Sequence, residues 1–134
     1  DVGIGNDNPS FKLDVGGTVT CTGFNNTSDV RLKTNINTIT SSLDVVKQLR
    51  GVTFNWSSSM FVNSGSDESL LGTKHGFIAQ EVETIVPSLV FEGRNSKTKG
   101  VKYTEVIPIL LESIKEQQTT IDNLISRVTA LENQ

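Results

Sequence analysis

A chain of 134 residues with a formal charge of -3 is long enough for one ordinary domain and too acidic for a general nucleic-acid binder. Only 35% of its residues are apolar, so a single copy can bury only a thin core, which favours an oligomer. The single cysteine, Cys21, excludes an internal disulfide, no cysteine and histidine cluster has metal-ligand spacing, and no apolar run reaches the about 18 residues of a membrane span.

Residues 1–27 predict the end of a fibrous β-stalk followed by a linker. Residues 2–5 and 12–19 alternate small and apolar side chains with a period of two, and clusters of glycine, asparagine and proline separate them. An ordinary β-meander is the alternative. Residues 23–27 form a polar loop that leaves the backbone free to move. The chain opens at Asp1 without a signal-peptide pattern, so we expect a piece of a longer protein.

Residues 28–36 place a possible nucleophile near a possible base, because Ser28 is followed by Lys33, with Arg31 between them. A serine hydroxyl is a poor nucleophile until a neighbouring group takes its proton, and an amine can do so once burial or a nearby cation favours its neutral form. We expect folding to bury Lys33 near Arg31. The alternative is that Ser28 or Asp29 caps a short helix, with Arg31 and Lys33 on a solvated face.

The spacing of this pair is unfavourable in regular structure. In a strand, two side chains five positions apart lie on opposite faces and about 16–17 Å apart, and in a helix they lie about 140° apart around the axis. Neither arrangement reaches the ~3 Å that proton transfer needs. The chain must therefore bend around Asp29 and Val30, or the lysine must come from a neighbouring copy.

The next segments predict a short helix and a strand. Leu43, Val46 and Leu49 have helical spacing after serines that can cap the helix, which Gly51 ends. Residues 52–56 then alternate as a strand. The simplest role for the aromatic side chains of this strand is core packing.

Residues 57–73 form a polar loop rich in serine and glycine, with a small apolar island at residues 60–62. Residues 75–86 predict a strand end that runs into an amphipathic helix, which Pro87 ends. Residues 89–103 predict a hairpin around a polar turn.

The segment at residues 75–86 carries polar side chains that can assist chemistry. His75 is the only histidine and therefore an alternative general base, although a loop histidine more often makes a structural hydrogen bond. Gln80 and Glu81 can orient a backbone segment, and exposed helix polarity explains them equally well.

From Thr104 the chain predicts a long helix whose apolar residues repeat in heptads, the pattern of a parallel coiled coil. Pro108 is tolerated in a first turn, so the helix is expected to begin near residues 104–106. β-Branched residues at position a with leucine at d favour two strands, and Gln117 is expected to set the register at a cost in stability. The seam consists of Ile107, Ile114, Ile121 and Val128 at position a and Leu110, Gln117, Leu124 and Leu131 at position d.

Residues 28–36, Ser-Asp-x-Arg-Leu-Lys-x-Asn-Ile, resemble the opening of the intramolecular chaperone domain. This family of self-cleaving serine/lysine peptidases occurs at the C-terminus of phage endosialidases, tail spikes and neck appendages, with relatives in a myelin regulatory transcription factor. The resemblance covers roughly residues 28–131. It continues in the order of the family through Phe54 and Trp56, residues 75–82, Pro87, Val101, Tyr103 and residues 108–111.

The resemblance implies a C-terminal intramolecular chaperone that drives homotrimer assembly of an upstream β-stalk of the same polypeptide and then releases itself. It makes Ser28 and Lys33 the catalytic pair and places the cut at Ser28. We favour the Ser28-Asp29 bond over Thr27-Ser28, although attack on the preceding carbonyl, through an N-to-O acyl shift, is the more familiar chemistry. The supporting residues would be Arg31, Asn35, His75, Gln80 and Glu81.

The expected architecture is α+β, with a β-stalk leader at residues 1–27, a mixed body at residues 28–103 and a helix at residues 104–134. The resemblance favours three strands in the coiled coil. It implies assembly in the host cytoplasm, with the fibre kept on the virion and the chaperone domain released. No cofactor, metal, nucleic acid or membrane is expected as a partner, and no glycine loop ahead of a helix cradles a phosphate.

Three alternatives remain open at this stage. The chain could be a non-catalytic trimerisation foot in which Ser28 only caps a helix. It could be a surface-binding fibre tip, for which the loop at residues 57–73 is the sequence feature. The regulatory-factor branch of the family is weaker, because the chain has no basic DNA-binding region.

Overall fold

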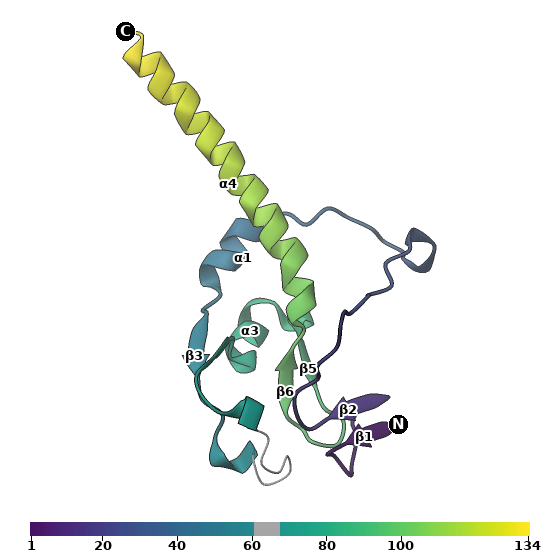
Figure 1. Ribbon diagram of the computed structural model, residues 1–134. Coiled ribbons are helices and arrows are strands. Elements are labelled where there is room, and N and C mark those ends of the chain that lie inside the picture. The colour runs from purple at the N-terminus through teal and green to yellow at the C-terminus, as the bar shows by residue number, and fades with distance from the viewer. Residues whose placement is uncertain (61–67) are drawn as a thin grey trace.

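The structure is a computed structural model that describes residues 1–60 and 68–134, and it shows a small body from which a long helix extends (Figure 1). This mixed α/β architecture, with short strands and the C-terminal helix α4 (Tyr103–Glu132), agrees with the expected α+β class. Within the described residues the strands form three two-stranded sheets. They pair β1 (Val2–Ile4) with β2 (Leu13–Val15), β3 (Val52–Phe54) with β4 (Lys74–Gly76), and β5 (Val90–Glu92) with β6 (Lys99–Val101).

The N-terminal strands β1 and β2 run parallel, with Val2 beside Leu13 and Ile4 beside Val15. The connection between them, residues 5–12, is shorter than an ordinary parallel crossover. The chain therefore loops back directly, and the two short strands pair edge to edge. The meander alternative is wrong for these two strands, because a meander is antiparallel. Val2, Ile4 and Leu13 all remain exposed.

The core of the body is small, as the composition predicts. It contains Val82 of α3 (Ala79–Ile85), Leu89 of the 3-10 turn η4 (Pro87–Leu89), and Val106 and Ile109 of α4. Among the partly buried residues that pack around it are Val45, Val46 and Leu49 from α1 (Ser42–Gln48) and its end. The predicted helices and the antiparallel β5–β6 hairpin are confirmed, and Pro87 follows α3 as expected.

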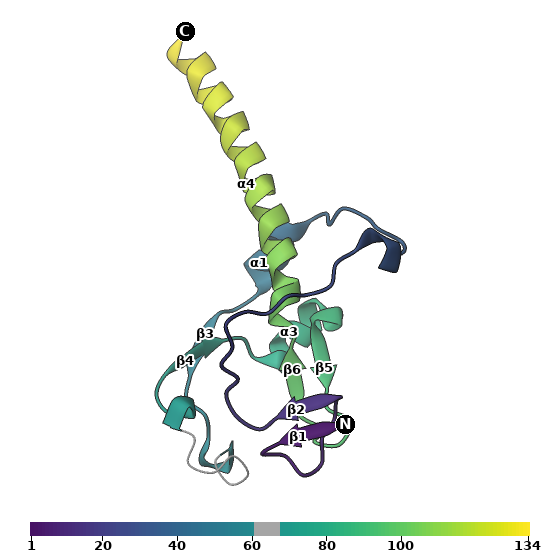
Figure 2. The ribbon, with the colours of Figure 1, turned by 45° about the vertical axis from the view of Figure 1, so that its right-hand side comes forward.

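Helix α4 begins at Tyr103, one residue before the predicted start, so Pro108 lies in its second turn. The missing N–H of a proline costs the helix one backbone hydrogen bond there, and the helix continues. At ~1.5 Å per residue, α4 is about 45 Å long. Its first turns face the body and its later turns extend beyond it (Figures 1 and 2).

A tyrosine joins the start of α4 to the strand β4. The Tyr103 hydroxyl accepts a hydrogen bond from the Phe77 N–H at 3.0 Å, and the two rings stack with centroids 5.7 Å apart. This approach requires Gly76, because a Cβ atom at that position would collide with the Tyr103 hydroxyl. The sequence motif around His75 therefore has a packing role in addition to any chemistry.

The cap of α1 comes from α4 rather than from the serines that the sequence suggests. Ser41 makes no side-chain cap, and its φ of 55° is left-handed. Instead, the Glu116 carboxylate accepts hydrogen bonds from the backbone N–H groups of Ser42 and Leu43, both at 2.9 Å. One side chain thus satisfies two unpaired donors at the helix start and fixes α1 against α4.

One prediction lies partly outside the described residues. Met60 ends the 3-10 turn η2 (Ser58–Met60), whereas the rest of the predicted apolar island at residues 60–62 falls in the segment that the structure does not describe.

Replacing Glu116 with glutamine should lower the free energy of unfolding by about 1 kcal/mol, and replacing it with alanine by about 2 kcal/mol, because one or both of the capped N–H groups lose their acceptor. Denaturant unfolding at a fixed protein concentration measures both values. Glu132→Gln, at the exposed end of α4, is the matched control and should change nothing. Equal stability of the Glu116→Ala chain and the wild type would refute the capping role.

Candidate active site at Ser28 and Lys33

Ser28 lies on an extended arm, residues 19–41, that leaves the N-terminal strands and returns to the body at α1 (Figures 1 and 2). Every residue of the arm except Asp29 is exposed. Its one regular element is a 3-10 turn, η1 (Val30–Leu32). The arm is therefore positioned by its own turn rather than by packing on the body.

Asp29 builds that turn. Its side-chain oxygen accepts a hydrogen bond from the Arg31 backbone N–H at 2.9 Å, which caps the turn. The Arg31 guanidinium also donates to both carboxylate oxygens, with the shortest contact at 2.7 Å. Backbone bonds from Leu32 N–H to Asp29 and from Lys33 N–H to Val30 close the turn. These contacts reverse the direction of the chain within a few residues.

The reversal brings the candidate pair together within one chain. Lys33 Nζ lies 2.5 Å from Ser28 Oγ and donates a hydrogen bond to it. These are the two atoms between which a proton would move if the neutral amine acted as base. Of the two routes that the spacing allowed, a bend and a neighbouring copy, the structure shows the bend.

The charge state of Asp29 follows from its partner. The hydrogen bond from the Arg31 side chain, and secondly the one from the Arg31 backbone, holds the pKa of the Asp29 carboxyl below its ordinary value. The same contact raises the pKa of Arg31. The carboxylate therefore stays ionised at neutral pH and keeps the turn closed.

Two features of the pair differ from the sequence-based expectation. Lys33 and Ser28 are exposed in the single chain rather than buried, like nearly all of the arm around them. Arg31 contacts Asp29, so its charge is neutralised there instead of acting on Lys33. The alternative hypothesis was that Ser28 or Asp29 caps a short helix and leaves Arg31 and Lys33 on a solvated face. The structure shows the Asp29 cap and the exposed basic residues together with the contact between Ser28 and Lys33.

The supporting candidates are not gathered at this pair. Asn35 is on the arm with a left-handed φ of 53°, and its carbonyl accepts a hydrogen bond from Asn37. Glu81 on α3 forms an ion pair with Arg50, whose side-chain hydrogen bonds lower the pKa of the carboxylate. His75 lies in β4 and Gln80 in α3, and Figure 2 shows both elements apart from the turn at residues 30–32 that holds the pair.

Residues of the segment 75–82, the second stretch that carries the family resemblance, instead line an open cavity of about 760 Å³. His75 and Gln80 share it with the aromatic side chains Phe54 and Trp56, whose rings meet edge to face at 5.1 Å. Trp56 is 39% exposed, so simple core packing does not describe it. In the single chain His75 and Gln80 therefore belong to the wall of this cavity. They do not join Ser28 and Lys33 as a third catalytic group.

The predicted coiled-coil seam is exposed along α4. Its seven apolar residues are between 43% and 64% exposed, and Gln117 is exposed with them. Within α4, the residues that are buried are Val106, Ile109 and Ser113, which lie between the seam positions and face the body. The helix thus uses one face for its own chain and presents the other, apolar face to the outside.

Two kinds of site are not formed by the described part of the chain. No helix there is long and apolar enough to span a membrane, and no three histidine, cysteine or acidic side chains gather as they would around a metal ion.

Comparisons with known proteins match the arm and most of the body. Residues 28–91 match a family of self-cleaving peptidase domains described as the chaperone of endosialidase. The myelin gene regulatory factor-like A of Dictyostelium discoideum is 28% identical over 84% of this chain and 12% of its own length. The long tail fiber proteins Gp37 of the enterobacteria phages K3 and T2 are each 30% identical over 75% of this chain, and 8% and 7% of their own lengths. The chain therefore spans about a tenth of the curated relatives it matches, and the resemblance in sequence is confirmed.

Replacing Arg31 with glutamine should raise the pKa of the Asp29 carboxyl towards its ordinary value of 3.8, because the hydrogen bonds that lower it are weakened. An acid titration followed by the NMR signal of that carboxyl measures the midpoint. Arg127→Gln, on the exposed part of α4, is the control and should leave the midpoint where it is.

The same titration has a consequence for stability. Because the folded-state pKa is depressed, the turn is fully stabilised above the ordinary pKa of Asp29 and loses that stabilisation as the pH falls through the depressed value. An Asp29 midpoint that is identical in the wild type and in Arg31→Gln would show that the turn is held by something else.

Proposed function

Because residues 28–91 match the chaperone of endosialidase family, we propose that the chain is an intramolecular chaperone of a phage tail fibre that cuts its own backbone once, at Ser28. The observation that supports the chemistry is the 2.5 Å contact between Lys33 Nζ and Ser28 Oγ inside the matched region. The phage tail fiber relatives support the client, an upstream stalk of the same polypeptide.

The chemistry begins with transfer of the Ser28 hydroxyl proton to a neutral Lys33 amine. The oxygen then attacks an adjacent backbone carbonyl. Attack on the Thr27 carbonyl carbon forms an ester to Ser28 and frees the Ser28 amine, and water then cleaves the ester to leave a Thr27 carboxylate. For the Ser28-Asp29 bond, the one we favour, the oxygen attacks the Ser28 carbonyl carbon, the C–N bond to Asp29 breaks, and the Asp29 amine leaves with the proton that Lys33 took. Water then opens the four-membered cyclic ester to a Ser28 carboxylate, so the serine stays on the N-terminal fragment. The two routes give fragments that differ by one serine, so their masses identify the bond.

Assembly is the proposed trigger, because Ser28 and Lys33 are already in contact in one chain but remain exposed to solvent. Exposed apolar side chains surround it on the arm, among them Phe24, Val30, Leu32 and Ile36. The apolar seam of α4 is exposed as well, and pairing of that seam in a homotrimer would bring the arms of neighbouring chains onto one another's bodies. A covered Lys33 loses its water, and this favours the neutral amine that the reaction requires.

The order of events follows from this coupling. The chain folds and trimerises in the host cytoplasm, Lys33 is covered, and the cut then separates the fibre that stays on the virion from its chaperone. A single cut makes assembly irreversible, because the released chaperone can no longer catalyse the return of the fibre to monomers.

A non-catalytic trimerisation foot remains the second candidate, because one observation favours it. Asp29 caps the turn and Lys33 is exposed, as expected of a solvated surface turn. The two candidates make opposite predictions for replacement of Ser28.

Ser28→Ala should abolish self-cleavage of the chain extended by its upstream stalk, and Lys33→Ala should slow it by about 10²–10⁴-fold, the range for loss of a general base. Mass spectrometry of the fragments measures both effects and identifies the bond. Lys47→Ala, an exposed lysine on α1, is the matched control and should cleave at the wild-type rate. Wild-type processing of Ser28→Ala would favour the trimerisation foot.

Ile121→Asp, in the middle of the seam, should keep the chain monomeric, because assembly would bury several carboxylates together. Sedimentation should show the change in mass, and self-cleavage should fall at least about tenfold, a difference of about 1.4 kcal/mol. Ser126→Asp, on the side of α4 opposite the seam, should assemble and cleave normally. A monomer that cleaves at the wild-type rate would disprove the trigger.

A further inference from the structure

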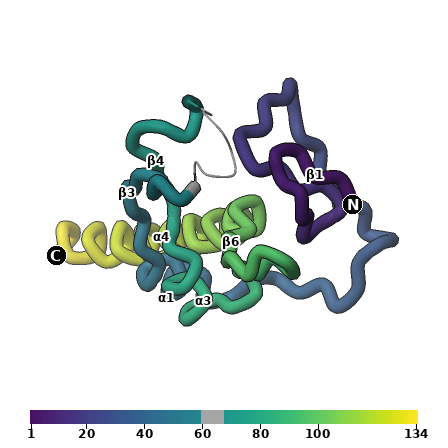
Figure 3. Tube along the Cα trace, turned by 90° about the horizontal axis from the view of Figure 1, so that it is seen from below, coloured from purple at the N-terminus to yellow at the C-terminus, as the bar shows by residue number. Residues whose placement is uncertain are grey.

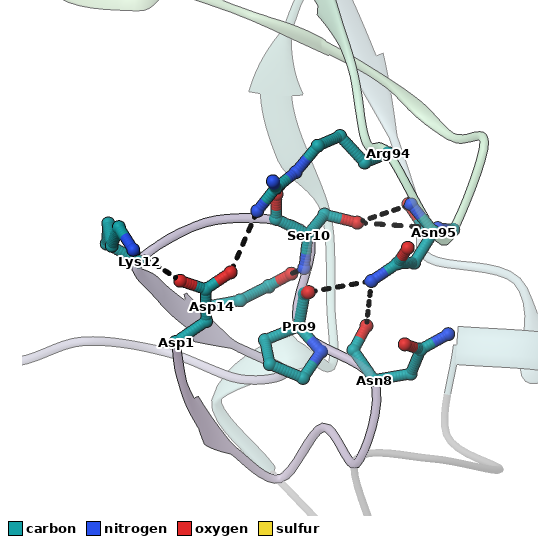
Figure 4. A network of polar contacts seen from close by, with 9 residues as sticks. Asp1, Asn8, Pro9, Ser10, Lys12, Asp14, Arg94 and Asn95 are labelled. Atoms are coloured by element: carbon teal, nitrogen blue, oxygen red, sulfur yellow. Dashed lines mark hydrogen bonds and ion pairs between the residues drawn. The ribbon is translucent and has the colours of Figure 1, made fainter.

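The turn of the β5–β6 hairpin, residues 93–98, holds a segment from the far N-terminal end of the chain, residues 8–11 (Figure 4). The two segments meet at the base of the body, where the N-terminal strands lie against the hairpin (Figure 2). Figure 3 shows the N-terminal segment on the side of the molecule opposite β3 and β4. Ser28 lies between the two segments in the sequence, so each of these contacts joins the two pieces that a cut at Ser28 would make.

Three of the hydrogen bonds go to backbone carbonyls of the N-terminal segment. The Asn95 side-chain amide donates to the Pro9 carbonyl at 2.7 Å, with a longer contact to the Asn8 carbonyl. The Arg94 Nε donates to the Ser10 carbonyl at 2.6 Å. Every residue carries a backbone carbonyl, so a turn that binds carbonyls accepts many sequences.

One position is recognised by size. Ser10 is 1% exposed, and its hydroxyl accepts hydrogen bonds from the backbone N–H groups of Asn95 at 3.0 Å and Ser96 at 3.4 Å. Gly93 leaves space in the turn, because a Cβ atom there would collide with the Ser96 hydroxyl and would also lie a tight 3.1 Å from the Ser10 hydroxyl. A small residue with a hydroxyl fits this place and a large apolar one does not.

Further contacts fix the segment around Ser10. Arg94 also forms an ion pair with Asp1, which Lys12 neutralises from the other side. The rings of Phe11 and Phe91 meet edge to face with centroids 5.4 Å apart. The exposed ion pairs contribute little by themselves, whereas the buried hydrogen bonds at Ser10 are costly to leave unmade.

We infer that this turn is the client-binding site of the chaperone. It binds an extended segment that offers consecutive backbone carbonyls around one small hydroxyl residue, and it keeps the two pieces together after the bond at Ser28 is broken. Cleavage and release are then two separate steps. That the bound segment is a client of the chaperone rests on the proposed function. That the turn binds the segment rests on the contacts alone.

The test uses the 134-residue chain with Ser28→Ala, so that the cut does not depend on the chemistry at Ser28. A recognition sequence for a site-specific protease replaces the exposed residues 23–27, and the protease makes the cut. The N-terminal fragment should stay with the body during gel filtration. Asn95→Ala and Arg94→Ala should each release it about tenfold faster, since each removes a hydrogen bond to a backbone carbonyl of the segment.

Two further changes control the experiment. Lys97→Ala alters the same turn at an exposed residue and should retain the fragment as the parent does. Ser10→Leu changes only the N-terminal piece and should release it at once, with the body unchanged by circular dichroism. A fragment that leaves the parent as fast as it leaves Asn95→Ala would overturn the inference. Failure of the wild-type chain to cut itself would instead refute the proposed function, because this test supplies its own cut.

Discussion

The hydrogen bond between Lys33 and Ser28 depends on a turn that a single carboxylate organises. Asp29 caps the turn through the Arg31 backbone and binds the Arg31 side chain, and the chain reverses between the serine and the lysine. A five-residue spacing that is useless in a helix or a strand becomes a contact of 2.5 Å. Because all of these residues lie within one short segment, the pair forms from local contacts, and the proposed assembly would change only its environment.

That environment is incomplete in one copy. The core is limited to a few side chains around Val82 and Ile109, while the seam of α4 and the apolar side chains of the arm face outward. Exposed apolar surface of this extent indicates a partner, and the seam and the arm would be covered together in a trimer. In this account, burial of Lys33 reports that neighbouring chains are in place. The contacts of residues 93–98 with the N-terminal segment would then keep the two fragments bound after cleavage, so that release of the chaperone is a separate step.

The sequence predicts the local elements well and the long-range contacts poorly. Heptads, helical spacing and the proline at residue 87 locate the helices, and the motif at residues 28–36 locates the pair. The exposure of Lys33 could not be foreseen, because it depends on what covers the arm. Nor could the cap that Glu116 supplies to α1, or the grip of Asn95 on Pro9, since their partners lie more than 70 residues away and no periodic pattern marks them. His75 and Gln80 were candidates either for assisting the chemistry or for a structural role, and both line a cavity together with Tyr103.

The central claim is that assembly covers an already formed pair, and refolding kinetics test it most directly. The wild-type chain with its stalk is diluted from denaturant at several concentrations, and trimer formation and fragment appearance are followed in the same samples. If assembly triggers the cut, fragments appear after trimers, with a delay that shortens as the concentration rises. Fragments that accumulate in monomers at a rate independent of concentration would contradict it.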